Sequence, residues 1–174
     1  IPPKQRDPMT NDSMRDAAKG TADKTTENHV NASPPAPSTG KGDLGGRGFR
    51  RILITGGAGF IGSHIANRLH ARGDHVTVID NESTGDRSAL NPAINFVKGD
   101  VRDYDALTPI FEAGVDAVLH IAGQASIRLS FMDPAEDLKT NTLGTINVLR
   151  QCTRFRVPRL LFASSMTIYG NTLI

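Results

Sequence analysis

The sequence has few of the residues that would indicate an exported or membrane-bound protein. Its 174 residues include one cysteine, Cys152, so no disulfide can form within the chain, as is usual in a reducing compartment. No apolar run approaches the ~18 residues that a membrane-spanning helix needs, and the N-terminus has no continuous apolar segment of the secretory type. We therefore expect a cytoplasmic protein without a membrane partner, and we expect Cys152 to be a small apolar helix residue.

The balance of charges is against a second class of partner. The net charge is +2, and residues 51–174 carry 12 Lys/Arg and 12 Asp/Glu, so this part of the chain is neutral. A nucleic-acid-binding domain would carry an excess of basic residues on one face. Four arginines do gather at positions 150–159, but a solvated surface explains them, and we expect no nucleic-acid partner.

Residues 1–49 differ in composition from the rest of the chain. They hold six of the ten prolines, and residues 32–48 are rich in Ser, Pro and Gly. Such a segment cannot bury enough apolar area to offset the entropy lost when it is ordered. We therefore expect a disordered extension over residues 1–49 and a folded domain over residues 50–174.

A glycine-rich turn follows the first apolar run of that domain. Residues 52–54 are apolar, Thr55 follows, and Gly56, Gly59 and Gly62 stand at the spacing G-x-x-G-x-x-G before an apolar four-residue repeat. The pattern predicts a buried strand, a tight turn and a helix. Gly56 permits the turn, Gly59 lets a pyrophosphate approach the backbone, and Gly62 lets the helix pack on the strand. The free N–H groups at the helix N-terminus suit a phosphate.

An acidic residue ends the second apolar run. Residues 75–79 are followed by Asp80, which stands 18 residues after Gly62. A dinucleotide-binding fold needs an acid about 20 residues after its glycine turn, where it accepts hydrogen bonds from the adenosine ribose. The glycines alone also fit a plain strand–helix connection, but Asp80 makes a nucleotide site the favoured interpretation. Its negative charge favours NAD over NADP, because it would repel a 2′-phosphate.

Strand and helix patterns alternate along the whole domain. This order predicts an α/β fold with a parallel sheet covered on both faces, in which ligands bind beyond the carboxyl ends of the strands. Thr55, Asp80, Asp100, His120 and Ser165 all fall at or just past those ends. The expected strands are residues 51–55, 75–79, 94–97, 116–121 and 159–163, and the expected helices are residues 60–72, 103–113 and 134–155.

Six segments, in order, resemble the extended short-chain dehydrogenase/reductase family, the NAD-dependent sugar-nucleotide epimerases and dehydratases. They are residues 55–62, 80–85, 99–103, 120–125, 141–145 and 164–170. The resemblance implies a Rossmann-type doubly wound parallel sheet that binds NAD, with no metal site. The cofactor-binding residues that it implies are Gly56, Gly59, Phe60, Ile61, Gly62, Asp80, Asn81, Ser83, Thr84, Gly85, Asp100, Val101, His120, Ile121, Ala122, Gly123 and Asn141.

Three of these residues also have structural explanations. Asp100 fits either a contact with the adenine edge or a cap for the next helix. His120 fits either a cofactor contact or a buried structural histidine. Asn141 is polar within a helix and has to find partners there, and in the family it is structural.

The catalytic centre that the family uses is only partly present. Ser165 stands where the family has a catalytic hydroxyl, but the family's base, a tyrosine with a lysine four residues later, is missing. Such a lysine lowers the phenol pKa from its usual ~10. The only tyrosines, Tyr104 and Tyr169, have no lysine at that spacing. We therefore expect the N-terminal part of a longer enzyme, truncated after the fifth strand, inactive alone and aggregation-prone because of its open sheet edge.

The resemblance implies a sugar-nucleotide epimerase similar to UDP-hexose 4-epimerase, in which bound NAD takes a hydride from the sugar and returns it to the other face. The family's dehydratases carry an acidic pair after the serine, where this chain has Met166 and Thr167. A dehydratase, decarboxylase or reductase stays an alternative, as does a non-catalytic NAD-binding module, since fold does not determine function. The partners implied are a nucleotide-sugar substrate and, at full length, a second copy in a homodimer.

Overall fold

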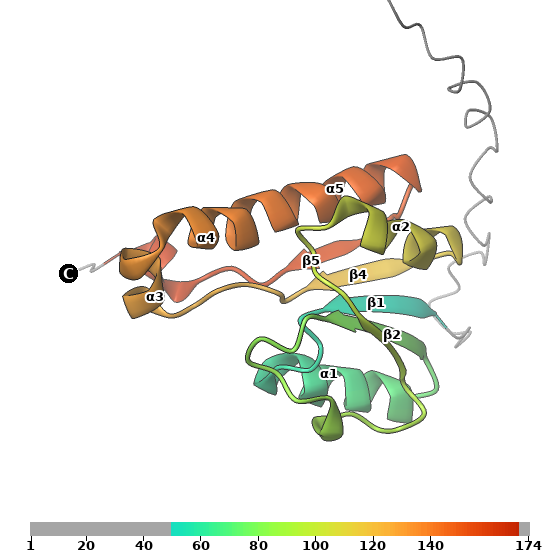
Figure 1. The fold of residues 1–174 in the computed structure, drawn as a ribbon. Helices are drawn as coiled ribbons and strands as arrows, with labels where there is room; N and C mark the ends of the chain where they lie inside the picture. Colours follow the sequence, from blue (N-terminus) through green and yellow to red (C-terminus); the bar gives the residue numbers. More distant parts are fainter. Residues whose placement is uncertain (1–49, 171–174) are drawn as a thin grey trace, which may run out of the picture. The chain divides into compact units, whose positions relative to one another are not determined.

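The computed structural model describes residues 50–170, and the expected disorder of residues 1–49 lies outside them. A five-stranded sheet forms the centre, with all strands parallel in the order β3-β2-β1-β4-β5 (Figure 1). The predicted α/β doubly wound parallel sheet is therefore confirmed. The strands are β1 (Arg51–Thr55), β2 (His75–Asp80), β3 (Asn95–Lys98), β4 (Ala117–His120) and β5 (Leu160–Phe162).

The central strand β1 supplies side chains to both faces of the sheet. Leu53 packs into one apolar cluster, whereas Ile52 and Ile54 pack into the other. Successive side chains of a strand point to opposite faces, so three consecutive apolar residues require a cover on each side. Such a run is the signature of a central strand in a parallel sheet.

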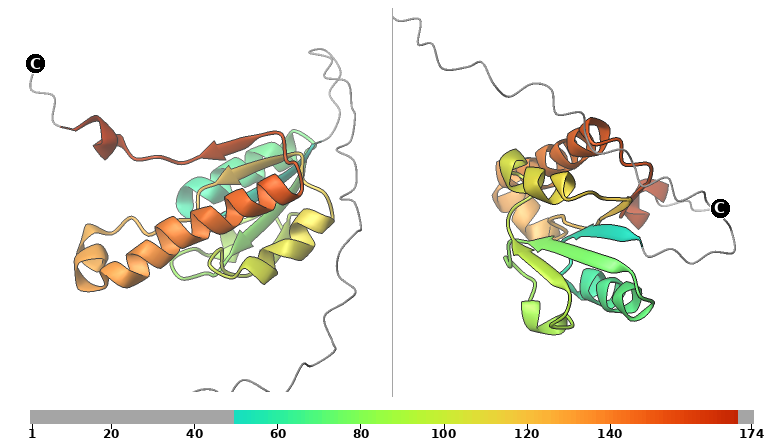
Figure 2. Two further views of the ribbon diagram at one scale, coloured as in Figure 1. Left: turned by 90° about the horizontal axis from the view of Figure 1, so that it is seen from above. Right: turned by 90° about the vertical axis from the view of Figure 1, so that its right-hand side faces the viewer.

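Helices cover the two faces of the sheet. Helix α1 (Phe60–Ala71) lies on one face, whereas α2 (Tyr104–Glu112) and α5 (Gly144–Arg154) lie on the other (Figure 2). Cys152 of α5 belongs to the same apolar cluster as Leu53, and burial raises the pKa of its thiol to about 11. The thiol therefore packs as an apolar group, as expected from the sequence.

The strand order reverses direction at β1, which pairs with β2 on one side and with β4 on the other. The chain leaves β1 toward α1 on one face, and it leaves β4 toward α5 on the opposite face. The loops after β1 and β4 therefore diverge, and a crevice forms between them at the carboxyl ends of the strands.

The helix predicted over residues 134–155 differs from the observed one in its middle. It consists of α4 (Pro134–Leu138), a π-helical turn η2 (Lys139–Leu143) and α5. Three short elements were not predicted from the sequence: the 3-10 turn η1 (Arg87–Ala89), helix α3 (Ile127–Met132) and the 3-10 turn η3 (Met166–Tyr169). All three are too short to show an apolar repeat, and η1 and α3 are each held by a local cap, from Asp86 or Ser126.

Candidate functional site

A cavity of about 360 Å³ opens at the carboxyl ends of the strands, where the loops after β1 and β4 diverge. Fourteen of the residues that the sequence predicted for cofactor binding line it: Gly56, Gly59, Phe60, Ile61, Gly62, Asp80, Asn81, Ser83, Thr84, Asp100, Val101, Ile121, Ala122 and Gly123. Their assignment to a cofactor stays a prediction, but the fold brings separate segments of the sequence to one cavity.

The glycine turn leads directly from β1 into α1. Gly56 has a φ of 68°, a conformation that favours glycine. A Cβ on Gly62 would lie 2.3 Å from the carbonyl oxygen of Gly56, so only glycine fits where the helix meets the turn. Gly59 caps α1 without a side chain, and the first N–H groups of a helix have no partner inside it. The start of α1, over Phe60, Ile61 and Gly62, therefore presents backbone donors at the cavity wall.

Asp80 ties the glycine turn to the segment after β2. Its side chain is buried at 9 % exposure, and its two oxygens accept hydrogen bonds from the backbone N–H groups of Ala58, at 2.9 Å, and Glu82, at 2.8 Å. Glu82 has a φ of 58° and pairs with Lys98 at 2.9 Å. The carboxylate is thus held at the cavity wall beside the glycine turn.

Asp100 accepts four hydrogen bonds at the end of β3. Three come from Arg102, through its backbone N–H at 2.9 Å, Nε at 2.9 Å and an Nη at 2.7 Å, and one comes from Asn81 Nδ2 at 2.8 Å. Burial alone would raise the pKa of Asp100, but the hydrogen bonds and charge of Arg102 and the bond from Asn81 outweigh it and hold the pKa at about 2. The carboxylate is therefore a fixed anion, and Asp103, rather than Asp100, caps α2.

His120 does not line the cavity, because its ring is buried between two threonines. Nδ1 lies 2.6 Å from Thr55 Oγ1, and Nε2 lies 3.0 Å from Thr145 Oγ1. Thr55 Oγ1 already accepts the N–H groups of Ile121 and Ala122, at 3.2 Å each, so its proton goes to Nδ1. The ring is then neutral with its proton on Nε2, and burial lowers its pKa. The cofactor-contact alternative for His120 gains no support from its position.

Asn141 also has its side chain bonded within the protein. Its Oδ1 accepts from the Gln124 N–H at 2.8 Å, and its Nδ2 donates to the Gln124 carbonyl at 2.9 Å and to Asp137 at 3.2 Å. It lies in the π turn η2, and it fastens the loop after β4 to that turn. The side chain therefore has the partners within the protein that a polar residue inside a helix requires.

Two further predicted residues, Gly85 and Ser165, are not among the residues that line the cavity. Gly85 packs on the glycine turn, where a Cβ would lie 2.7 Å from the carbonyl carbon of Ala58. Ser165 is exposed after β5 and accepts a hydrogen bond through its carbonyl from Ile168 at 3.3 Å.

Four lining residues were missed by the sequence analysis: Ile79, Gly99, Ala125 and Thr140. Gly99 directly precedes Asp100, and Ala125 belongs to the predicted segment 120–125, so both had a signal in the sequence. Thr140 had none, because it reaches the cavity from inside the π turn.

Residues 50–170 contain no group of three His, Cys, Asp or Glu side chains arranged to hold a metal ion. In the same range, no helix has the length and apolar character needed to cross a membrane.

Comparison with known proteins gives a consistent match. Residues 52–173 match the model of the NAD dependent epimerase/dehydratase family. Over 121 residues, which are 69% of this chain and 40% of the relative, the chain is 42% identical to a putative UDP-glucose 4-epimerase of Methanocaldococcus jannaschii. UDP-glucuronic acid decarboxylase 1 of Danio rerio is 40% identical over 122 residues, 70% of this chain and 29% of that protein.

Among solved structures, the UDP-glucose 4-epimerase of Thermus thermophilus in complex with NAD superimposes with a TM-score of 0.64 at 43% identity. The match covers 66% of this chain and 37% of that structure. The chain thus spans about 40% or less of the length of these relatives.

Proposed function

The chain belongs to the NAD-dependent epimerase/dehydratase family, and on this premise we propose that it forms the NAD-binding part of a sugar-nucleotide epimerase similar to UDP-hexose 4-epimerase. The observation that carries the proposal is the bond from the Ala58 N–H to Asp80 at 2.9 Å. It joins the glycine turn and the acid at the end of β2 in one cavity, as dinucleotide binding requires. We propose that the corresponding domains are a Pro/Gly/Ser-rich extension, residues 1–49, and an NAD-binding domain, residues 50–174.

The residues present fit NAD. A phosphate needs backbone donors and a close approach, and the glycine turn with the start of α1 offers both, since Gly56, Gly59 and Gly62 line the cavity without side chains. Asp80 is suited to the ribose hydroxyls and opposes a 2′-phosphate, which favours NAD over NADP. Asn81, Ser83, Thr84 and Gly85 then complete the ribose-binding turn.

The residues that would contact the adenine and the middle of the dinucleotide are assigned by the same logic. The adenine edge would meet the Asp100 carboxylate and the Val101 N–H, and the middle of the cofactor would follow Ile121, Ala122 and Gly123, which line the cavity after β4. For His120 and Asn141 we propose indirect roles, because both side chains are already bonded to protein groups.

The chemistry in this proposal divides between cofactor and chain. NAD supplies a reversible hydride acceptor when bound. Ser165 would donate a hydrogen bond to the sugar oxygen that loses its proton, and neither tyrosine of this sequence has the lysine four residues later that the family's base requires. We propose that the full-length protein acts on a nucleotide sugar in the cytoplasm. We also propose that it forms a homodimer, which the exposed apolar side chains of Leu138, Ile146 and Leu149 on α4 and α5 would support.

A decarboxylase of the same family is the second candidate, because UDP-glucuronic acid decarboxylases are also among the relatives. The two activities differ in their products. Full-length protein supplied with UDP-galactose should give UDP-glucose, whereas UDP-glucuronic acid should be recovered unchanged. Release of carbon dioxide from UDP-glucuronic acid would overturn the epimerase assignment. Binding of NAD without turnover of either substrate would favour the non-catalytic NAD-binding module.

A further inference from the structure

We propose that Arg102 is a positioning residue that orients the Asp100 carboxylate toward the base of a bound dinucleotide, and that it thereby sets the preference for adenine. The inference rests on the proposed NAD site. Asp100 and Val101 line the cavity, whereas Arg102 and its partner Glu136 do not. Arg102 therefore acts through Asp100 rather than on the ligand.

The side chain of Arg102 fixes the plane of the carboxylate. Nε donates to one oxygen of Asp100 at 2.9 Å, and an Nη donates to the other at 2.7 Å, so the pair is bidentate. A guanidinium holds a carboxylate in its own plane in this geometry, which an ammonium group cannot reproduce. The Arg102 N–H and Asn81 supply the remaining two hydrogen bonds, and the 6-amino group of a bound adenine would take the acceptor position that Asn81 Nδ2 holds here.

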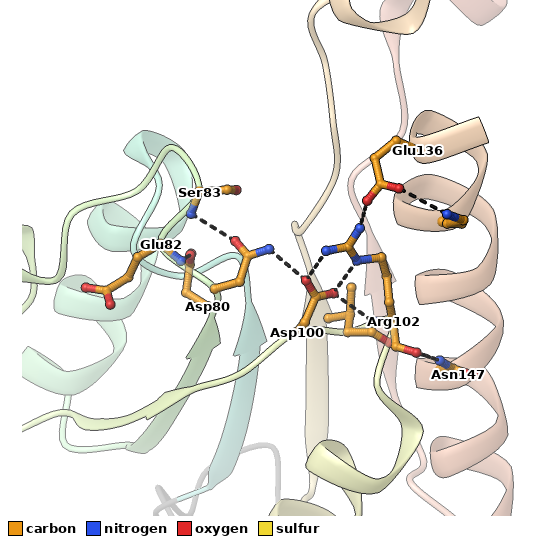
Figure 3. Close-up of polar contacts among 10 residues, drawn as sticks. Asp80, Glu82, Ser83, Asp100, Arg102, Glu136 and Asn147 are labelled. Carbon is orange, nitrogen blue, oxygen red and sulfur yellow. Dashed lines mark hydrogen bonds and ion pairs between the residues drawn. The ribbon is translucent and has the colours of Figure 1, made fainter. Parts of the chain in front are cut away.

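Glu136 of α4 holds Arg102 from its other side. One Nη of Arg102 pairs with a Glu136 oxygen, and the second oxygen of Glu136 lies 3.3 Å from Lys139 Nζ in the π turn. Figure 3 shows Arg102 between Asp100 on one side and Glu136 on the other. The guanidinium thus lies between two carboxylates, and its orientation is set by a helix that follows it by more than 30 positions.

The backbone beneath this pair is anchored to α5 as well. The buried Asn147 donates to the carbonyl groups of Val101, at 3.1 Å, and Arg102, at 2.9 Å. Gly144 packs so closely on Val101 that a Cβ there would lie 2.7 Å from the valine side chain. Since the backbone is held independently, the direction of the Asp100 carboxylate depends on the side-chain bonds from Arg102.

Base preference follows from this orientation. Adenine presents a donor, the 6-amino group, beside an acceptor, N1, whereas hypoxanthine presents a carbonyl beside an N1–H. A fixed Asp100 anion next to the Val101 N–H matches adenine and opposes hypoxanthine. Loss of one hydrogen bond to a charged group costs roughly a factor of ten or more in affinity.

The test compares NAD with nicotinamide hypoxanthine dinucleotide by titration calorimetry on the full-length protein. The wild type should bind NAD roughly tenfold or more tightly than the analogue. In Arg102→Met the dissociation constant for NAD should rise about tenfold and that for the analogue much less, so that the preference collapses. Arg102→Lys should be intermediate. Glu136→Gln, a change outside the cavity, should lower the preference by a smaller factor.

Arg87→Met is the matched control, since Arg87 is stacked over Phe96 at 4.9 Å and does not line the cavity. This variant should prefer NAD over the hypoxanthine analogue by the same factor as the wild type. An unchanged preference in both Arg102 variants overturns the inference, as does an equal loss of affinity for both dinucleotides. A wild type that binds neither dinucleotide overturns the proposed function and this inference together.

Discussion

Replacing Gly62 by alanine should damage the candidate NAD site directly. The new Cβ would lie 2.3 Å from the Gly56 carbonyl oxygen and 2.6 Å from the Cα of Gly57. Ordinary contacts between such atoms are about 3.5 Å, so α1 and the turn have to separate by roughly 1 Å. Forced overpacking costs about 1–3 kcal/mol, which lowers the melting temperature by roughly 4–12 °C at about 4 °C per kcal/mol.

The same movement should weaken NAD binding by more than the loss of stability explains. The α1 N-terminus and the turn together form the phosphate cradle in this proposal, and losing one charge-assisted hydrogen bond weakens binding roughly tenfold to a hundredfold. Titration calorimetry at a temperature where the variant is folded measures this directly, and thermal unfolding measures the stability.

Gly57→Ala provides the matched control. Its Cβ would also meet atoms at 2.6 Å, but these belong to the Val78 side chain in the core, and Gly57 does not line the cavity. This variant should lose stability to a similar extent and keep its NAD affinity within about threefold. If Gly62→Ala binds NAD as tightly as the wild type, or if both variants lose affinity equally, the phosphate cradle is not where we propose.

Three further predictions concern ionisable groups. Asp80→Asn leaves the Ala58 or Glu82 N–H without its acceptor, so the affinity for NAD should fall about tenfold and the preference for NAD over NADP should narrow. If calorimetry finds the same preference for NAD as in the wild type, the NAD assignment is contradicted. Burial lowers the pKa of His120 below 6.5, so as the pH falls the unfolded chain binds a proton at this histidine before the folded chain does. The contribution of His120 to the free energy of unfolding should therefore be constant above pH ~6.5 and fall below it. Urea titrations from pH 7.5 to 5.5 should show a smaller decline in His120→Gln, and identical declines would refute this origin. Asp100 has a pKa of about 2 against 3.8 ordinarily, so its contribution is present above pH 3.8 and is lost as the pH falls toward 2. Acid titration of Asp100→Asn should lack this component, and an unchanged acid midpoint would argue against it.

The sequence predicted the elements whose signals are local. Each strand was predicted to within one or two residues, because short apolar runs between glycine and polar turns mark buried strands. Helix α2 was equally clear from its four apolar positions on one face, although the sequence offered Asp100 as its possible cap and the structure uses Asp103. Helix α3 was missed because six residues are too few to show a period, and its cap, Ser126, has no distinctive neighbour.

The candidate site divides in the same way. The glycine turn, Asp80 and Asp100 were predicted from spacing and from positions at strand ends, and the fold brings all of them to one cavity. Thr140 was missed because it enters the cavity through a π turn, which no periodicity at 3.6 residues indicates. The choice between two roles for His120 was also beyond the sequence, since it depends on Thr55 and Thr145, 65 and 25 residues away.

By itself, then, the sequence determined the order of the elements, the turn that accepts a phosphate and the acid at the end of the second strand. These depend on backbone conformations and spacings within a few residues, which side-chain volume and glycine impose locally. Only the tertiary structure decided that Arg102 meets Glu136, that Asn141 fastens to Gln124 and that His120 is enclosed by two threonines. Those contacts depend on how the sheet stacks its loops and helices, and each partner is 17 or more residues away in the chain.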